Sequence, residues 1–244
     1  ASVITITDTI CAVATAPGRG GIGIVRASGS LVPDIARAMT GGLPSPRYAS
    51  FTAFKDPDQT VLDEGLVLYF KAPDSFTGEH VLELHGHGGP IVLDMVVATL
   101  LSHGARMARP GEFSERAFLN GKLDLSQAEA VADLIAATTE AAARSATRSL
   151  QGVLSTQVDT CARHLVELRA YIEAAIDFPD DELDLLNDTQ LRSRLESAKA
   201  ALADFMTQAS RGVLLTEGCT VVLAGAPNAG KSSLLNLLSG TESA

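Results

Sequence analysis

The chain has 244 residues, of which 46% are hydrophobic, and it carries a formal net charge of −10 at pH 7. This length and composition support one or two domains with ordinary cores and argue against a largely disordered chain. Because no apolar run reaches the roughly 18 residues that span a bilayer, and the N-terminal segment lacks the features of a secretion signal, we predict a cytoplasmic location and no membrane partner.

Charge and cysteine content narrow the function classes further. Residues 1–120 carry 9 Lys and Arg against 12 Asp and Glu, a net of −3, and residues 121–244 carry 10 against 17, a net of −7. A nucleic-acid-binding surface normally gathers cations that neutralise phosphates, and no such cluster is visible here. If RNA is the substrate, another part of the protein or a partner would supply much of the binding. The three cysteines are widely spaced and form no C-x-x-C pair, which predicts reduced thiols.

Residues 1–120 predict an α+β domain. Short β-like runs at 9–14, 21–27, 66–70 and 81–87 predict strands. One helix is predicted over 31–40, ahead of two glycines. A second is predicted between Pro90, at its first position, and Gly104, just past its last turn.

The predicted strand at 81–87 has an unusual polar face. Its period-two alternation puts Glu83, His85 and His87 on one side and two leucines on the other. Three interpretations remain open: a solvent-exposed face, a metal site at the H-x-H pair, or a carboxylate presented to a ligand with N–H donors. The glycines at 86, 88 and 89 favour close approach of the backbone to another group.

Two cations add to this picture. Arg26 interrupts an apolar strand, and Lys122 lies just ahead of a predicted helix. Each alone is typical of a surface cation. Together with Glu83, they could provide one acceptor for a pterin or amide edge and two cations for carboxylates, a combination that suits a folate-like molecule.

From about residue 121 the pattern changes to alanine-rich helices. Ser126 and Glu129 match an S-x-x-E capping box at a helix start. Apolar stripes follow, and they predict helices that pack as an antiparallel bundle. The stripes consist of Leu165, Leu168, Ile172 and Ile176 and, beyond an acidic break at 178–182, of Leu191, Leu195, Ala198, Leu202 and Phe205.

A phosphate-binding loop occupies residues 225–232, after an apolar run at 221–224 and before a helix-like segment. Its glycines allow backbone N–H groups to turn toward a phosphate, Lys231 can reach the outer phosphates, and the Ser232 hydroxyl can ligate magnesium. The alternative is a chance glycine-rich turn. Nothing in the loop distinguishes GTP from ATP. Residues 216–244 are too few for an independent domain, which predicts truncation inside a nucleotide triphosphatase.

Several runs carry a resemblance to a known family. They are A-P-G-R-G-G at 16–21, S-F-T-G-E at 75–79, L-E-L-H-G-H-G-G-P at 82–90, R-P-G-E-F-S-E-R-A-F-L-N at 109–120, A-A-I-D-F-P at 174–179 and N-A-G-K-S-S at 228–233. With these runs the chain resembles the MnmE (TrmE) family of tRNA-modification GTPases over essentially its whole length.

The resemblance implies three parts. These are a folate-binding α+β domain over 1–120, similar to the glycine-cleavage T-protein fold, an all-α helical bundle domain over 121–215, and over 216–244 the first strand, loop and helix of a Ras-like P-loop α/β GTPase domain. The family forms homodimers through the N-terminal domain and works with a flavoprotein partner, MnmG. Together they add a carboxymethylaminomethyl or aminomethyl group to C5 of the wobble uridine (U34) of certain tRNAs.

The resemblance also implies cofactors and site residues. A tetrahydrofolate derivative, in its 5,10-methylene or 5-formyl form, supplies the one-carbon unit, and GTP hydrolysis depends on Mg²⁺ and K⁺. By match to the family's motifs, Arg26, Glu83 and Lys122 would contact the folate. GTP would be held by Asn228, Ala229, Gly230, Lys231, Ser232 and Ser233. Of these, Ser232 would bind magnesium and Asn228 would help to hold potassium.

The 244 residues depart from the family in one respect, because they end before its switch segments, its D-x-x-G metal motif and its N-K-x-D guanine reader. We therefore expect residues 1 to about 210 to fold and dimerise, residues 216–244 to lack order of their own, and folate binding to persist without GTPase activity. No catalytic residue is assigned. Two alternatives stay open: a stand-alone folate-binding dimerisation module without catalysis, and a metal-dependent hydrolase that uses His85 and His87.

Overall fold

A computed structural model describes residues 8–177, 189–217, 222–226 and 229–239. The chain divides into two compact units, one made of residues 1–136 and 146–156 and the other of residues 137–145 and 157–244. None of the described helices combines the length and the apolar character that crossing a bilayer requires.

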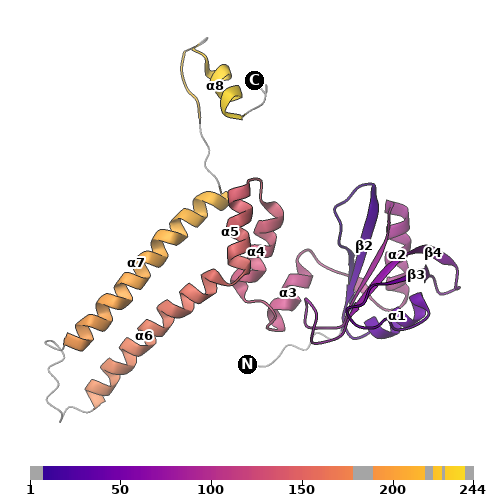
Figure 1. Cartoon of the computed structure of the whole chain (residues 1–244), viewed down its shortest axis with the longest axis horizontal. Coiled ribbons are helices and arrows are strands. Elements are labelled where there is room, and N and C mark those ends of the chain that lie inside the picture. The colour runs from indigo at the N-terminus through magenta and orange to yellow at the C-terminus, as the bar shows by residue number, and fades with distance from the viewer. Residues whose placement is uncertain (1–7, 178–188, 218–221, 227–228, 240–244) are drawn as a thin grey trace. The chain divides into compact units, whose positions relative to one another are not determined.

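The first unit is built on one six-stranded sheet (Figure 1). Its strands are β1 (Ile10–Val13), β2 (Gly20–Ser28), β3 (Ser50–Lys55), β4 (Val61–Phe70), β5 (Val81–Gly88) and β6 (Arg106–Met107), in the spatial order β3-β4-β5-β2-β1-β6. Neighbouring strands are antiparallel, except that β1 and β6 pair in parallel. The predicted α+β class of residues 1–120 is thereby confirmed.

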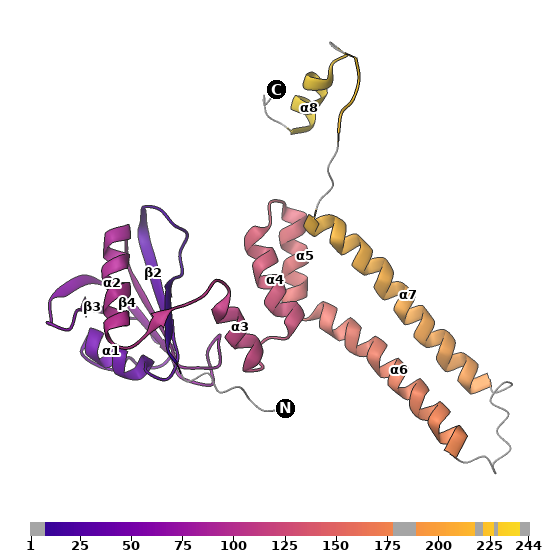
Figure 2. The ribbon, with the colours of Figure 1, turned by 180° about the vertical axis from the view of Figure 1, so that it is seen from behind.

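Two helices, α1 (Val32–Thr40) and α2 (Pro90–Ser102), pack on the sheet (Figure 2). Every second residue of the central strands β2 and β5 enters this core: Val25, Ala27, Leu82 and Leu84 are at most 2% exposed. Burying each larger side chain stabilises the fold by about 1.5–3 kcal/mol. Because side chains alternate along a strand, the same pairing leaves Arg26 and Glu83 on the opposite face.

The structure adds three elements that the sequence analysis missed. The edge strand β3, the two-residue strand β6 and the helix α3 (Glu112–Leu119) all lie within residues 1–120. Two of the residues that α3 buries, Glu112 and Arg116, are charged, so its sequence shows no ordinary apolar stripe. Strand β4 also begins at Val61, five residues before the predicted start of that strand at 66.

Four helices follow: α4 (Leu125–Ala136), α5 (Glu140–Leu150), α6 (Val153–Asp177) and α7 (Thr189–Glu217). The predicted capping box at the start of α4 is wrong by two residues. The backbone N–H of Gln127 donates to Asp124 Oδ1 over 2.9 Å, and the backbone N–H of Asp124 donates to Gln127 Oε1 over 3.0 Å. The helix begins earlier than Ser126 allows, so Asp124 and Gln127 occupy the two capping positions.

In the second unit, α6 and α7 run side by side in opposite directions (Figures 1 and 2). The antiparallel arrangement agrees with the prediction, but the apolar stripes do not form a closed core between them. Leu165, Ile176, Leu195 and Leu202 are 54%, 62%, 45% and 49% exposed, whereas Ala198 is buried. Two helices bury only the narrow seam along which they touch. The acidic break at 178–182 lies outside the described residues.

The last helix, α8 (Lys231–Ser239), follows the glycine-rich loop, as predicted. The strand expected before that loop is not found, because the described residues 222–225 adopt no strand. Val222 is 80% exposed, and an isolated strand cannot satisfy its backbone without a neighbouring strand. Within 216–244 the structure describes a helix, α8, and the expectation that this segment lacks order of its own stays a prediction.

Candidate functional site

Three polar side chains gather on the sheet face opposite α1 and α2. Arg26 of β2 and Glu83 of β5 are register partners, and Arg26 Nε and Nη2 donate to Glu83 Oε1 over 2.9 and 2.7 Å. The other carboxylate oxygen, Oε2, lies 3.0 Å from Nε2 of His85. We call these three residues the Arg26–Glu83–His85 cluster. Its side chains are only 30%, 14% and 23% exposed.

The cluster keeps its carboxylate ionised. Burial by itself raises the pKa of Glu83, but the hydrogen bond from His85 and the charge and hydrogen bonds of Arg26 outweigh it, so this pKa lies below its usual value. Glu83 is therefore an acceptor-only group near neutral pH, suited to a ligand that presents N–H donors.

Aromatic rings border the cluster. The guanidinium carbon of Arg26 lies 5.8 Å from the ring centre of Phe76 and 5.8 Å from that of Phe113. Both distances fall within cation–π range. Phe76 belongs to the segment between β4 and β5, and Phe113 to the first turn of α3. Neither aromatic residue was predicted as a site residue, although both lie in runs that carry the family resemblance.

The side chain of Lys122 lies beside Gly78, in the segment between β4 and β5 that also carries Phe76. Gly78 adopts a φ of +78°, and a Cβ there would lie 3.2 Å from Cγ of Lys122 and 3.1 Å from Cβ of Asn120. The side chain of Asn120 donates to the Thr77 carbonyl over 2.7 Å. The stem of Lys122 thus lies beside Gly78, two residues after Phe76 in the chain. Among the described residues, Arg26 and Glu83 contact each other and neither contacts Lys122, so the role of Lys122 at this site stays a prediction.

A buried ion-pair network holds the parts of this region together. Arg116 of α3 is 0% exposed, and its guanidinium donates to Glu79 Oε2 over 3.1 Å, to Asp8 Oδ1 over 2.8 Å and to Glu112 Oε1 over 3.2 Å. Glu79 also accepts a 2.7 Å hydrogen bond from Ser28 of β2. The network therefore links the segment that carries Phe76, the helix that carries Phe113, and the strand that carries Arg26.

The metal interpretation of His85 and His87 finds no support. His85 contacts Glu83, whereas Nδ1 of His87 lies 2.7 Å from Oδ1 of Asp63, so each imidazole has its own carboxylate partner. Across the part of the chain that the structure describes, no three His, Cys, Asp or Glu side chains are grouped as metal ligands would be.

The glycine-rich loop places Lys231 near its own backbone. The Lys231 ammonium donates to the carbonyls of Gly225 and Ala226 over 2.9 and 2.7 Å. Gly230 adopts a φ of +82°, and Ser232 and Ser233 lie exposed in the first turn of α8. Ala229 is also exposed, and Asn228, predicted to bind GTP and potassium, lies outside the described residues.

Comparison with known proteins decides the family. The profile of the "GTP-binding protein TrmE N-terminus" matches residues 9–122, and that of the "MnmE helical domain" matches residues 125–239. The chain belongs to the MnmE (TrmE) family. Within it, Arg26, Glu83 and Lys122 all fall in the N-terminal match, which ends at Lys122.

Curated MnmE relatives are similar throughout this chain. A tRNA modification GTPase MnmE of Pseudomonas syringae pv. tomato is 59% identical over 237 residues, which cover 97% of this chain and 52% of the relative. One of Yersinia pseudotuberculosis is 57% identical over 239 residues, which cover 98% of this chain and 53% of the relative. The chain thus spans about half the length of the curated MnmE proteins it matches.

Proposed function

We propose that this chain serves GTP-dependent modification of the wobble uridine of tRNA, and that it holds a tetrahydrofolate at the Arg26–Glu83–His85 cluster. The observation that carries the proposal is the cluster itself. It combines an ionised, half-buried carboxylate, a guanidinium and two aromatic rings inside the region that matches the family's N-terminal domain.

The chemistry of these groups fits a folate. Glu83 can accept the N–H donors of a pterin edge, and Phe76 and Phe113 offer apolar faces to its ring system. Because a pterin edge competes with Arg26 for Glu83, binding frees guanidinium N–H donors for an oxygen of the ligand. The Lys122 ammonium, for which no ion pair is found among the described residues, can bind a ligand carboxylate. A bound 5,10-methylene or 5-formyl tetrahydrofolate would supply the one-carbon unit.

The nucleotide part of the proposal rests on the glycine-rich loop. Lys231 would exchange its two backbone carbonyl partners for the outer phosphates of GTP, and Ser232 would contribute a magnesium ligand. Ala229, Gly230 and Ser233 would border the phosphates, and Asn228 would contribute to potassium binding. The proposed partners are a second copy bound through the N-terminal domain, the flavoprotein MnmG, and tRNA. The proposed domain limits are 1–120, 121–215 and 216–244.

Calorimetry with 5-formyltetrahydrofolate tests the folate site. We expect Glu83→Ala and Lys122→Ala each to weaken binding by about tenfold, because each removes a charge-assisted hydrogen bond. Lys55→Ala is the matched control: it removes a lysine from the edge strand β3 and is expected to leave the affinity unchanged. If both site variants bind with the affinity of the parent chain, the ligand does not occupy this cluster.

A further inference from the structure

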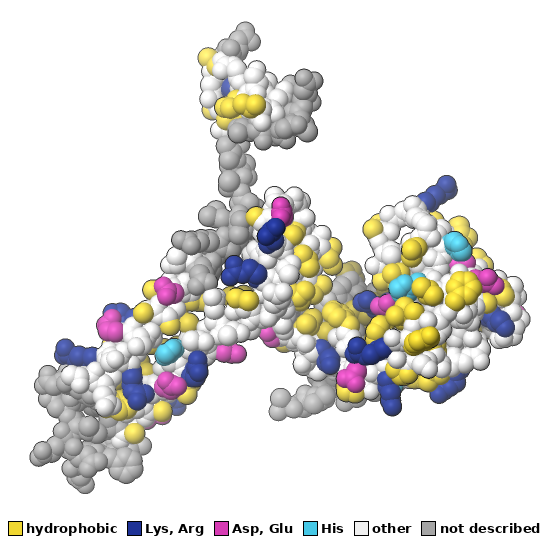
Figure 3. Space-filling model, viewed as in Figure 1, with side chains coloured by type: hydrophobic (Ala, Val, Ile, Leu, Met, Phe, Trp, Pro, Cys, Tyr) yellow, Lys and Arg dark blue, Asp and Glu magenta, His cyan; other side chains and the backbone are white. Residues whose placement is uncertain are grey.

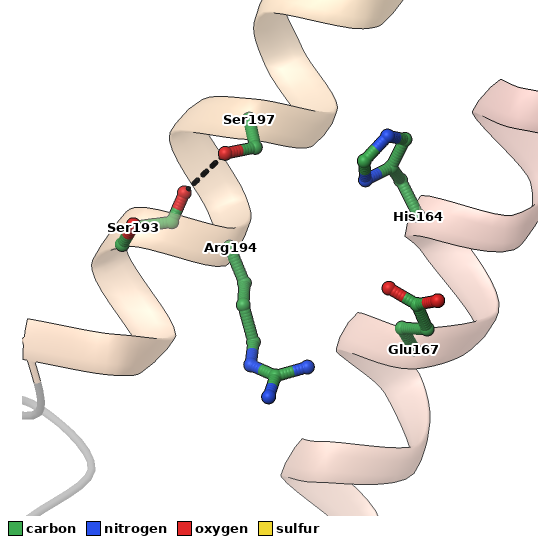
Figure 4. A pocket seen from close by; sticks show the side chains of 5 residues that line it. All are labelled: His164, Glu167, Ser193, Arg194 and Ser197. Atoms are coloured by element: carbon green, nitrogen blue, oxygen red, sulfur yellow. Dashed lines mark hydrogen bonds between the residues drawn. The ribbon is translucent and has the colours of Figure 1, made fainter.

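The second unit contains a pocket of about 220 Å³ between α6 and α7 (Figure 4). Its lining is polar: His164 and Glu167 come from α6, and Ser193, Arg194 and Ser197 come from α7. At ~30 Å³ for each water molecule, the pocket has room for about seven, which is far more than a single ion needs. None of these residues takes part in the proposed folate or GTP sites.

Two opposite charges in this pocket do not pair with each other. Figure 4 shows Glu167 and Arg194 extending into the same space from facing helices. Some charges on these helices pair locally: Arg169 pairs with Glu173 over 2.8 Å, and Lys199 with Glu196 over 3.0 Å. Among the described residues, no ion pair or hydrogen bond is found for the side chains of Glu167 and Arg194, so both can serve a ligand.

One aromatic contact borders the guanidinium of Arg194. Its central carbon lies 5.0 Å from the ring centre of Tyr171 on α6, within cation–π range. A cation–π contact does not use up the N–H donors of a guanidinium. The pocket therefore presents guanidinium donors on one side and the two acceptor oxygens of Glu167 on the other.

This arrangement excludes two simple ligands. A phosphate would bring negative charge beside the Glu167 carboxylate, which opposes it. A transition metal would need more ligands than one imidazole and one carboxylate, and no cluster of three suitable side chains is found among the described residues. A planar group with hydrogen-bond acceptors on one edge and donors on another complements both Arg194 and Glu167.

We infer that this pocket binds a guanine base. Guanine presents the acceptors N7 and O6 on its Hoogsteen edge, which an arginine binds with two parallel hydrogen bonds. On its Watson–Crick edge it presents the donors N1–H and N2–H, which a carboxylate accepts with two oxygens. Arg194 thus takes the first edge and Glu167 the second. Adenine offers a donor and an acceptor on each edge, so it matches neither side fully.

The source of the base is an unpaired guanosine of RNA, an assignment that rests on the proposed role in tRNA modification. Proteins commonly recognise RNA by taking an unstacked base onto aromatic or guanidinium planes and reading its edges. A single base pocket also suits a chain without a continuous basic stripe. On the face shown in Figure 3, cationic and acidic side chains are interspersed over α6 and α7.

The first experiment measures binding of nucleosides to the whole chain by saturation-transfer NMR. Nucleosides lack phosphates, so the glycine-rich loop does not contribute. We expect guanosine to bind about tenfold more tightly than adenosine, and Glu167→Gln and Arg194→Met each to reduce that preference to about twofold, because a methionine offers no donors to N7 and O6. The control Lys199→Met removes a cation from the same helix outside the pocket and should change nothing. Equal binding of guanosine and adenosine would overturn the inference.

Analogues assign each edge of the base. Replacing guanosine by 7-deazaguanosine removes the N7 acceptor and should weaken binding to the parent chain but not to Arg194→Met, which has no donor for N7. Inosine lacks the N2 amino group and should lose affinity only while Glu167 is intact. If either loss is the same in parent and variant, the assigned contact is wrong. Because all these side chains are on exposed helix faces, circular dichroism should show parent-like folding.

The second experiment separates RNA from free nucleotide as the source. Fluorescence anisotropy with a labelled tRNA should show severalfold weaker binding for Glu167→Gln than for Lys199→Met. If guanosine binds selectively but tRNA affinity is equal in both variants, the pocket serves a free guanine nucleotide and the RNA assignment is wrong. If the chain binds no tRNA while 5-formyltetrahydrofolate and guanosine both bind, the proposed role in tRNA binding fails, and the pocket's base specificity stands.

Discussion

At the residue scale, Glu112 shows how this chain keeps charged groups in its interior. Its side chain is 1% exposed, yet its pKa is lowered to about 2. Hydrogen bonds from Arg106 contribute most to this lowering, and hydrogen bonds from the Arg109 backbone and from Arg116 add to it. Burial acts in the opposite direction and raises the pKa. The hydrogen bonds between Arg106 and Glu112 also raise the pKa of Arg106. Breaking a buried ion pair from one side leaves the other charge uncompensated, so single substitutions here should be costly.

Glu112 predicts an acid dependence of stability. A folded-state pKa of about 2, below the ordinary value of 4.5, means that its contribution is full above pH 4.5 and is lost as the pH falls toward 2. We expect Glu112→Gln to lower the free energy of unfolding by about 3 kcal/mol at pH 7, and this difference to shrink between pH 4.5 and pH 2. Urea denaturation at several pH values measures both.

Glu115→Gln is the matched control for this change. Glu115 lies on the same helix and pairs with Arg109, but both side chains are exposed, at 46% and 65%. Its removal should change stability by less than about 0.5 kcal/mol at any pH. A pH-independent cost of Glu112→Gln would show that the network stabilises by shape and packing instead of charge.

At the element scale, the start of α4 depends on local hydrogen bonds that sequence inspection placed two residues too late. Asp124 accepts from the Gln127 backbone and also from Oγ of Ser155 over 2.6 Å, while the Gln127 side chain donates to the Leu150 carbonyl over 2.9 Å. Two possible capping pairs overlap here, Asp124 with Gln127 and Ser126 with Glu129. The contacts with Leu150 and Ser155 favour the earlier pair. Local sequence therefore predicts that a cap exists but not which residue provides it.

Substitutions distinguish the two capping assignments. Asp124→Ala should lower the free energy of unfolding by about 1 kcal/mol, because it removes the acceptor for a free backbone N–H at the helix start. Glu129→Ala should cost less than about 0.5 kcal/mol, since its position is inside the helix and makes no cap. Thermal unfolding followed by circular dichroism compares them. A larger loss for Glu129→Ala would restore the box at Ser126 and Glu129.

At the scale of the whole molecule, the Arg26–Glu83–His85 cluster and the glycine-rich loop differ in how firmly the surrounding elements hold their residues. Arg26, Glu83 and His85 stand on paired strands, whereas residues 222–225 before the loop form no strand, and Leu237 of α8 is 79% exposed. Phosphate binding needs backbone N–H groups held rigidly by packed elements. Among the described residues, that support is present at the cluster and absent at the loop.

One preparation of these 244 residues should therefore give three separate results. It should bind 5-formyltetrahydrofolate, sediment as a dimer of 25.4 kDa chains, and release phosphate from GTP no faster than a Lys231→Ala variant. Brisk GTP turnover that depends on Lys231 would show that the loop is rigid enough for catalysis. A mass of one chain in sedimentation equilibrium would remove the proposed homodimer.

Much of the fold could be predicted from local pattern, and the exceptions are instructive. Short β-like runs located β2 and β5, period-two alternation gave the polar face of β5, and Pro90 and Gly104 bracketed α2, because each signal lies within or next to the element that it specifies. Helix α3 was missed since its buried positions carry Glu112 and Arg116, which only distant partners such as Asp8 and Glu79 make acceptable in a core. The strand at 221–224 was predicted from apolar residues alone, and it lacks a neighbour within the described residues.

By itself, the sequence determined the family, the α+β class of the first 120 residues, the succession of helices after them and the chemical character of Arg26, Glu83 and Lys122. Only the tertiary structure decided that Arg26 and Glu83 neutralise each other, that Phe76 and Phe113 border them, and that Glu167 and Arg194 face one pocket without pairing. The physical reason is the difference in sequence range between the two kinds of signal. Propensity and periodicity act over a few residues, whereas a site is made by contacts between residues far apart in the chain, which the packing of elements alone brings together.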